Sequence, residues 1–250
     1  MTALDDVWIR RYHAGPENGP TLVCFPHAGG SASYYVPLSN ALRSGVQVLA
    51  IQYPGRQDRH HEPPLSTVDE LADQAFAALG PLLDRPVALF GNSMGALVAF
   101  EVADRMKRTL GAAPVTLFAS SRRAPSAYRE ESVHLRDDEG LIEDLKRLSG
   151  TDVRILNDPE LLGMILPPMR NDYKAVETYR CRPGARLDCP VVVMIGDEDP
   201  TVDADEAKAW SHHTTGPFDL HTFSGGHFYL AQHQQEVAGL IRRRLAPQQG

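Results

Sequence analysis

The sequence predicts an α/β protein in which a mostly parallel sheet carries helices on both faces. Short apolar runs, each long enough for one strand, alternate along the chain with segments whose apolar residues recur at helical spacing. The runs are apolar at almost every position, which is typical of parallel strands buried on both faces. A length of 250 residues suffices for one such domain with a modest insertion, so we expect residues 1–250 to form a single domain.

Six apolar runs are the candidate strands. They lie at residues 21–26, 46–52, 86–90, 115–119, 191–195 and 218–223. Between the second and third runs, apolar residues follow the i, i+3, i+4 pattern from Val68 to Leu83, and Ser66 or Thr67 is a plausible cap for this helix. The segment from Met94 to Met106 is apolar nearly all round, which predicts a helix buried against the sheet. A last helix follows from apolar residues at Val237, Leu240, Ile241 and Leu245.

One region interrupts the alternation of strands and helices. Residues 122–186 contain no candidate strand and show helical patterns at 141–148 and 161–179. An insertion between two strands is well placed to form a helical lid over the carboxyl edge of the sheet, where open α/β sheets bind ligands. The alternative is a helical decoration without a gating role.

Composition excludes several classes of function. The net charge of −7 argues against a general nucleic-acid-binding protein. No apolar stretch approaches the ~18–20 residues needed to span a membrane, and the first residues lack the features of a signal peptide. The three cysteines, Cys24, Cys181 and Cys189, lack metal-ligand spacing, and Cys24 lies in a run predicted to be buried. We therefore expect a cytoplasmic protein without a metal or other cofactor.

The segment around Ser93 is the strongest chemical signal in the chain. Gly91-Asn92-Ser93-Met94-Gly95 has the G-x-S-x-G pattern, directly after a predicted strand and directly before a predicted helix. This context is typical of the nucleophile elbow of the α/β-hydrolase fold, where glycines let strand and helix approach and a sharp turn exposes the serine hydroxyl. The helix N-terminus also favours developing negative charge. We expect Ser93 to be a nucleophile; an ordinary Gly/Ser turn is the alternative.

His227 is the expected general base. A serine hydroxyl is a weak nucleophile that needs a base, and in this fold the chain order is serine, acid, histidine. His227 lies in a glycine-rich loop, Ser224-Gly225-Gly226-His227-Phe228, between the last predicted strand and the last helix. The other histidines of this part of the chain are expected on solvated helix surfaces or within a strand: His212, His213, His233 and His221.

Asp199 is the expected orienting acid. The segment Gly196-Asp197-Glu198-Asp199-Pro200 follows a predicted strand and offers three carboxylates. Asp199 precedes a proline, where the loop can turn back toward the histidine. Asp197 remains the rival candidate, with turn or helix capping as its structural alternative.

The oxyanion hole requires two backbone N–H groups that point at the developing charge. One is expected from Met94, the residue after the nucleophile, and the other from Ala28 in the loop after the first core strand. Glycines in this loop allow its amides to turn inward, although an ordinary flexible loop is the alternative. His27 is expected either to contact substrate or to hold the loop. Elsewhere in the chain, the consecutive residues His60-His61-Glu62 resemble a metal site in composition alone, and a solvated loop is the favoured interpretation.

Taken together, these motifs resemble the type II thioesterases that accompany polyketide and nonribosomal peptide synthases, over essentially the whole chain. The matching segments are Phe25-Pro26-His27-Ala28-Gly29-Gly30, Tyr53-Pro54-Gly55-Arg56 with Arg59, the elbow, Gly196-Asp197-Glu198-Asp199-Pro200, Gly225-Gly226-His227-Phe228, and Leu166-Pro167-Pro168-Met169-Arg170-Asn171-Asp172-Tyr173 with Glu177 and Tyr179. The Pro-Gly-Arg segment and the insertion motif are the most specific, because generic hydrolases lack them. Asn92 departs from the histidine that is usual in this family.

The resemblance implies an enzyme that hydrolyses acyl groups from the phosphopantetheine arm of carrier proteins and so removes aberrant or stalled units. The implied partners are carrier-protein domains of a synthase, with no nucleic acid and no membrane. A carboxylesterase or lipase, or an acyltransferase, would use the same triad. Residues 122–186 contain 12 Lys and Arg and 12 Asp and Glu, so the insertion is the least repulsive surface for an acidic carrier, and we expect Arg122 and Arg123 to contribute to it.

Overall fold

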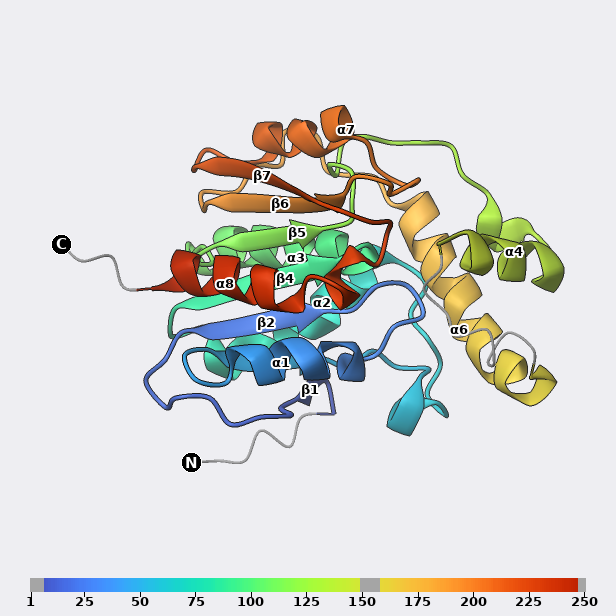
Figure 1. Ribbon diagram of the computed structural model, residues 1–250, viewed down its shortest axis with the longest axis horizontal. Coiled ribbons are helices and arrows are strands. Elements are labelled where there is room, and N and C mark those ends of the chain that lie inside the picture. The colour runs from blue at the N-terminus through green and yellow to red at the C-terminus, as the bar shows by residue number, and fades with distance from the viewer. Residues whose placement is uncertain (1–6, 149–157, 247–250) are drawn as a thin grey trace.

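A seven-stranded sheet forms the centre of the computed structural model, which describes residues 7–148 and 158–246. The strand order is β1-β3-β2-β4-β5-β6-β7 (Figure 1), and every neighbouring pair is parallel except β1 with β3. The strands are β1 (Ile9–Arg10), β2 (Thr21–Phe25), β3 (Gln47–Ile51), β4 (Val87–Asn92), β5 (Leu117–Ser120), β6 (Val191–Gly196) and β7 (Phe218–Phe223). The predicted fold class is confirmed.

All six predicted strands are present, with ends that differ from the prediction by at most two residues. β1 was not predicted, because two residues are too few to show a period. In β2, alternate side chains enter different cores: Leu22 and Cys24 pack on one face of the sheet, and Val23 and Phe25 on the other. This two-sided burial explains why the parallel strands are continuous apolar runs, and it confirms the expectation for Cys24.

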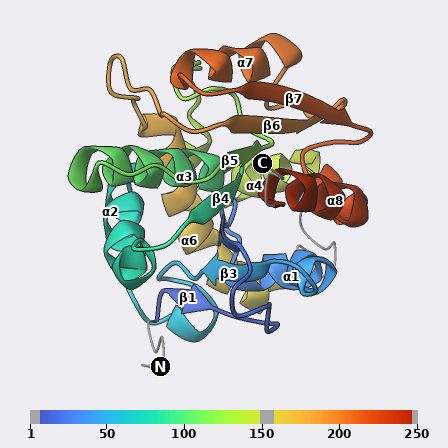
Figure 2. The same ribbon diagram turned by 90° about the vertical axis from the view of Figure 1, so that its left-hand side faces the viewer.

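Helices cover both faces of the sheet (Figure 2). The short helix α1 (Val36–Leu42) packs with α8 (Gln234–Leu245) on one face, and α2 (Val68–Leu79) packs with α3 (Met94–Arg105) on the other. A further helix, α7 (Ala204–Lys208), follows β6.

The predicted helix before β4 begins as expected and ends early. Thr67 caps α2, with its hydroxyl oxygen accepting from the N–H of Glu70 at 3.1 Å. The helix ends at Leu79 and a 3₁₀ turn follows over Gly80–Leu82, because the proline at position 81 has no N–H to continue the helical hydrogen bonds. Every residue of α3 is buried, which confirms the expectation of a helix packed against the sheet.

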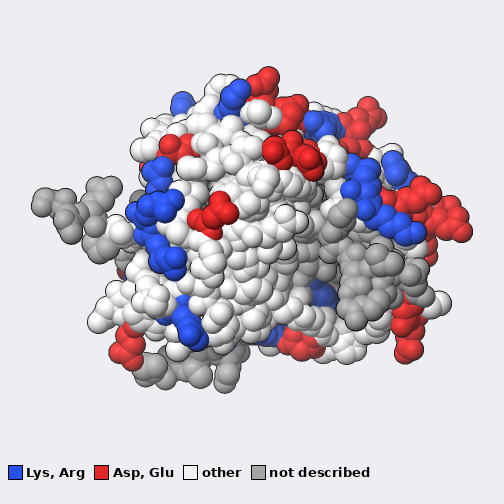
Figure 3. Space-filling view, in the orientation of Figure 1, with Lys and Arg blue, Asp and Glu red and all other residues white. Residues whose placement is uncertain are grey.

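The region between β5 and β6 forms the predicted helical insertion at the carboxyl end of the sheet (Figure 1). In the part of this region that the structure describes, the α-helices are α4 (Asp138–Leu148) and α6 (Pro159–Thr178). A small apolar cluster that includes Val133 and Leu141 ties them together. Around this insertion, basic and acidic side chains lie side by side on the face shown in Figure 3. Among the described residues, no helix has the length and apolar character needed to cross a membrane.

Candidate active site

Ser93 lies in a strained turn between β4 and α3. Its backbone angles, φ 53° and ψ −116°, are outside the regions that residues other than glycine usually adopt. A Cβ on Gly91 would lie 2.1 Å from the carbonyl oxygen of Gly95, and a Cβ on Gly95 would lie 1.9 Å from that of Phe25. Both glycines are therefore required by the close approach of strand and helix that holds the Ser93 turn.

His227 and Asp199 form a buried pair at the ends of neighbouring strands. The Nδ1 atom of His227 lies 2.9 Å from Oδ2 and 3.1 Å from Oδ1 of Asp199, and the two side chains are 4% and 0% exposed. Their loops touch, since a Cβ on Gly196 would lie 2.2 Å from the carbonyl oxygen of Gly225. Burial acts to raise the pKa of Asp199, but hydrogen bonds from His227 and Thr201 outweigh it and lower the pKa, so the carboxylate is ionised at neutral pH.

Asp197 makes a different contact. Its Oδ1 accepts a hydrogen bond from the backbone N–H of Gly225 at 2.8 Å, and thereby holds the loop that carries His227. Of the two aspartates considered as orienting acid, only Asp199 hydrogen-bonds to the imidazole ring among the described residues.

Two hydroxyl side chains that the sequence reasoning missed support this pair. Thr201 donates to Oδ1 of Asp199 at 2.8 Å through its hydroxyl and at 2.9 Å through its N–H, and its hydroxyl lies 3.0 Å from Nδ1 of His227. Ser121 donates to the carbonyl oxygen of His227 at 2.7 Å. A threonine two residues after an aspartate is a recognisable turn signal, whereas the contact from Ser121 spans 106 positions and leaves no local signal.

The two residues predicted to supply oxyanion-hole amides, Met94 and Ala28, both lie beside Ser93. Met94 begins α3 immediately after Ser93, and Ala28 lies in the wall of the cavity that contains Ser93 and His227. Neither N–H donates a hydrogen bond to any residue in the described ranges. By contrast, the next amide along, that of Gly29, donates to Oδ2 of Asp172 at 2.7 Å.

The imidazole of His27 stabilises this loop and also lines the cavity. Its Nδ1 lies 2.9 Å from the carbonyl oxygen of Ala28, and its ring packs edge-on against Tyr34 and Phe228. Burial lowers the pKa of His27 to about 4, so the ring is neutral at physiological pH.

The buried carboxylate of Asp172 joins the insertion both to Arg56 and to the loop that carries Ala28. Asp172 of α6 is 0% exposed and pairs with Arg56, which follows β3. The same carboxylate accepts from the Gly29 N–H, and Met169 fills the space beside Gly29. The Pro-Gly-Arg segment and the insertion motif thus meet at this loop. No local sequence pattern indicates that contact, because the paired residues are 116 positions apart.

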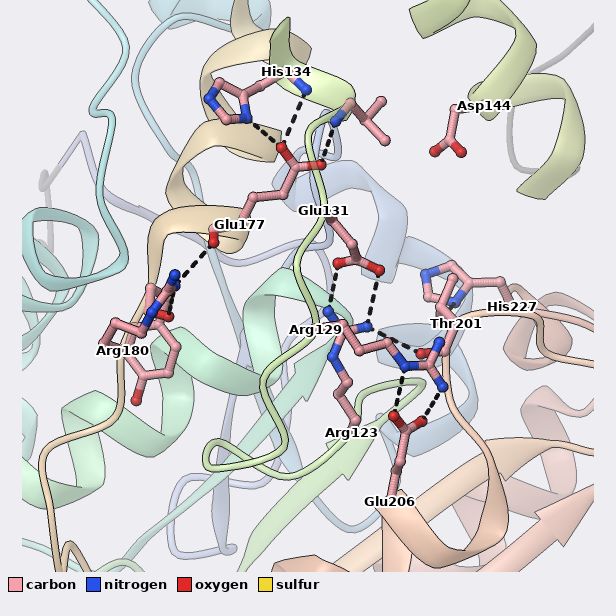
Figure 4. Close-up of polar contacts among 12 residues, drawn as sticks. Arg123, Arg129, Glu131, His134, Asp144, Glu177, Arg180, Thr201, Glu206 and His227 are labelled. Atoms are coloured by element: carbon pink, nitrogen blue, oxygen red, sulfur yellow. Dashed lines mark hydrogen bonds and ion pairs between the residues drawn. The ribbon is translucent and has the colours of Figure 1, made fainter.

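The cavity beside Ser93, which we call the serine cavity, has a volume of about 90 Å³. Its wall includes Ser93 and His227 from the sheet edge and apolar side chains of the insertion, among them Leu145, Leu148 and Met169. Glu177 also lines it, and accepts hydrogen bonds from the N–H of Val133 and from the backbone and ring of His134 (Figure 4). The insertion therefore covers the serine.

Some expectations about individual residues were wrong. His213 is 6% exposed rather than solvated, because its ring contacts Ser126 and the carbonyl of Ala185. Arg123 is not part of a docking surface: it is 3% exposed and paired with Glu131. Arg123 and its neighbour Arg122 both line the serine cavity.

Asn92 and the two adjacent histidines, His60 and His61, lie outside the serine cavity. The side chain of Asn92 is buried and accepts a hydrogen bond from Ser120 at 2.8 Å. His60 and His61 are exposed, as expected for a solvated loop.

Comparison with known proteins agrees with this geometry. The model of the thioesterase domain family matches residues 20–245. A probable cadicidin biosynthesis thioesterase of Streptomyces griseus is 49% identical over 99% of this chain and 69% of its own length, and the thioesterase PikA5 of Streptomyces venezuelae is 47% identical over 98% and 87%. Among solved structures, the type II thioesterase BorB from the borrelidin biosynthetic cluster superposes with a TM-score of 0.90, at 51% identity over 96% of this chain and 98% of BorB.

The type II thioesterase YbtT of the yersiniabactin pathway is a more distant structural relative, with a TM-score of 0.84 at 28% identity over 95% of this chain and 98% of its own. The family model spans nearly the whole sheet and both flanking helical layers. The chain therefore belongs to the thioesterase family and is an enzyme that hydrolyses thioesters.

Proposed function

We propose that the chain removes acyl groups from the phosphopantetheine arm of carrier proteins in polyketide or nonribosomal peptide biosynthesis, and that it does so in the cytoplasm. The observation that carries the chemistry is the buried His227–Asp199 pair in the same cavity as the strained Ser93. The carrier-bound substrate is supported by the relatives. They include a probable cadicidin biosynthesis thioesterase, the type II thioesterase BorB from the borrelidin biosynthetic cluster, and YbtT, a type II thioesterase from the yersiniabactin NRPS/PKS biosynthetic pathway. The three cysteines, all free thiols, are compatible with a reducing compartment.

In the proposed mechanism, the hydroxyl oxygen of Ser93 attacks the thioester carbonyl while Nε2 of His227 takes the hydroxyl proton. The N–H groups of Ala28 and Met94 stabilise the resulting oxyanion. Asp199 keeps the Nδ1 proton of His227 oriented and stabilises the imidazolium. When the tetrahedral intermediate collapses, the carbon–sulfur bond breaks and His227 returns the proton to the thiolate, which leaves an acyl-serine.

The second half of the cycle repeats these roles with water. His227 takes a proton from a water molecule that attacks the acyl-serine, and the same two amides hold the second oxyanion. Collapse releases the carboxylic acid and returns the proton to Ser93. No metal or organic cofactor takes part in these steps.

Labelling and kinetics test this proposal. An active-site phosphonate should modify Ser93, and Ser93→Ala should abolish hydrolysis of an acylated carrier protein while leaving the circular dichroism spectrum unchanged. The matched control is Ser33→Ala, a serine whose hydroxyl bonds to Ser31 and Gln57 outside the serine cavity. Modification of another serine, or near-normal turnover by Ser93→Ala, would remove Ser93 from the mechanism.

The carrier preference needs its own comparison. The same acyl group should be hydrolysed with a higher kcat/KM on a carrier protein than on a short thiol, because binding energy remote from the thioester can position it against Ser93. Equal values for the two thioesters, or faster hydrolysis of simple oxygen esters, would favour a small-molecule esterase.

A further inference from the structure

A second cavity adjoins the serine cavity and has an unusual charge. We call it the arginine cavity; its volume is about 230 Å³. Five arginines line it, and none of the described residues in its wall is Asp or Glu: Arg122, Arg123, Arg129, Arg180 and Arg182. Arg122, Arg123 and Val176 line both cavities.

Three of these arginines already have carboxylate partners. Arg123 binds Glu131, and Arg129 makes two hydrogen bonds to Glu206, at 2.7 and 2.6 Å (Figure 4). Arg182 binds Asp104 at 3.0 Å. Their charges are therefore largely compensated within the protein.

The other two arginines have no carboxylate partner among the residues that the structure describes. Arg180 donates only to the carbonyl oxygens of Glu177 and Tyr179, and its guanidinium lies 3.6 Å from the ring centre of Tyr128. The guanidinium of Arg122 makes no hydrogen bond in the described part of the chain, and its Nε is buried.

Burial and the neighbouring charge of Arg123 lower the pKa of Arg122 to about 9. At neutral pH this side chain is still a cation, held where an anion would stabilise it. Two carboxylates, Glu131 and Glu206, act on it electrostatically, but they are engaged by Arg123 and Arg129. The wall of the arginine cavity thus contains two guanidinium groups, of Arg122 and Arg180, that no carboxylate of the described residues binds directly.

We propose that the arginine cavity binds the phosphate group of the phosphopantetheine arm, while the serine cavity holds the acyl chain. This proposal rests on the carrier-arm substrate of the proposed function. A thioester substrate has an acyl part and a thiol part, and the site has two adjoining cavities. The serine cavity combines apolar side chains such as Leu145 and Met169 with three arginines and three acidic residues, whereas the arginine cavity has five arginines and no Asp or Glu among its described lining residues. Guanidinium groups match phosphate oxygens in charge and geometry.

The dimensions agree with this arrangement. Met169 of α6 packs against Gly29, in the loop beside Ser93. Arg180 lies eleven residues after Met169, just beyond the C-terminal end of α6. At 1.5 Å per residue that path is about 16 Å long. The extended chain from thioester sulfur to phosphorus has thirteen bonds, which span about 15 Å at the spacing of an extended backbone.

Two small substrates test the site directly. The same short acyl group is presented on pantetheine and on 4′-phosphopantetheine, at constant ionic strength, to the wild-type enzyme. The phosphorylated thioester should have a kcat/KM about 10- to 100-fold higher, as expected for charge-assisted hydrogen bonds. Arg180→Gln and Arg122→Gln should each reduce this ratio about tenfold. Arg85→Gln, an exposed arginine at the opposite end of β4, should leave it unchanged.

A ratio of one in the wild-type enzyme, or a ratio that survives both substitutions, would overturn the proposal. Added inorganic phosphate distinguishes a cavity that binds the phosphate of the substrate from one that binds a free anion as an effector. It should raise the KM of the phosphopantetheine thioester and leave that of the pantetheine thioester unchanged. Altered turnover of the phosphate-free thioester would instead indicate a free-anion effector and contradict the tethered-arm assignment. A carrier preference without a phosphate effect would refute only the arginine cavity, whereas no thioester hydrolysis at all would refute the proposed function.

Discussion

The ion pair between Asp172 and Arg56 makes the most quantitative prediction from this structure. Asp172→Asn keeps the shape of the side chain and an acceptor for the Gly29 N–H, but removes the charge opposite Arg56. Both side chains are nearly inaccessible to water, with Asp172 at 0% and Arg56 at 7% exposure. Leaving one partner of a buried pair uncompensated costs about 3–5 kcal/mol. For a chain of this size, that lowers the melting temperature by about 6–20 °C.

Thermal unfolding followed by calorimetry measures this change, and Asp188→Asn is the matched control. Asp188 pairs with Lys107 at 2.8 Å, but both side chains are exposed and screened by water, so its loss should leave the melting temperature nearly unchanged. If Asp172→Asn and Asp188→Asn lowered the melting temperature equally, the buried pair would have no special role and the reasoning would be refuted.

A double substitution separates stability from catalysis. Replacing both partners with apolar residues, Arg56→Met with Asp172→Leu, should recover much of the stability lost in Asp172→Asn, because no uncompensated charge remains. Thioester hydrolysis should nevertheless be lower than in the wild type, by up to the about 10²–10³-fold that a lost oxyanion donor costs, because leucine offers no acceptor to the Gly29 N–H beside Ala28. Full recovery of kcat would show that this contact does not position the loop.

Three further outcomes are expected. Asp199→Asn should lower kcat by about 10⁴-fold and Asp197→Asn far less, and the reverse ranking in steady-state kinetics would move the orienting role to Asp197. Gly95→Ala should yield little folded protein by circular dichroism, because its Cβ would lie 1.9 Å from backbone of β2, whereas Gly80→Ala, with open space, should fold normally. For His27, the folded pKa of about 4 is below the ordinary value of 6.5, so the neutral ring stabilises the fold above pH 6.5 and this contribution is lost as pH falls toward 4. His27→Gln should therefore lose less stability than wild type over that range, by up to about 3 kcal/mol; parallel pH profiles in urea unfolding would contradict this.

The parts of the fold that the sequence predicted have local and repeated signals. Parallel strands buried on both faces are continuous apolar runs, and the G-x-S-x-G turn is a five-residue motif whose first glycine is required by the close approach of its last. β1 and α1 were missed because two and seven residues are too few for a period to emerge.

The expectations that were wrong depended on tertiary contacts. His213 was assigned to a solvated helix surface, yet packing against Trp210 and the Ser126 hydroxyl buries it. Arg123 was assigned to a docking surface from charge counts alone. Its ion pair with Glu131 and its bond to the carbonyl of Thr201 place it in the cavity wall instead.

The position of α6 connects the insertion to the chemistry at Ser93. Asp172 ties α6 to Arg56 and to the Gly29 N–H, and Met169, one turn earlier, packs on the same loop. One helix therefore supplies part of the wall of both cavities and also fixes the backbone that carries the Ala28 amide. A displacement of α6 would move this amide and the cavity wall together, so we expect substrate fit and the proposed oxyanion stabilisation to change together. The insertion thus acts as a positioning element for the site as well as a cover over it.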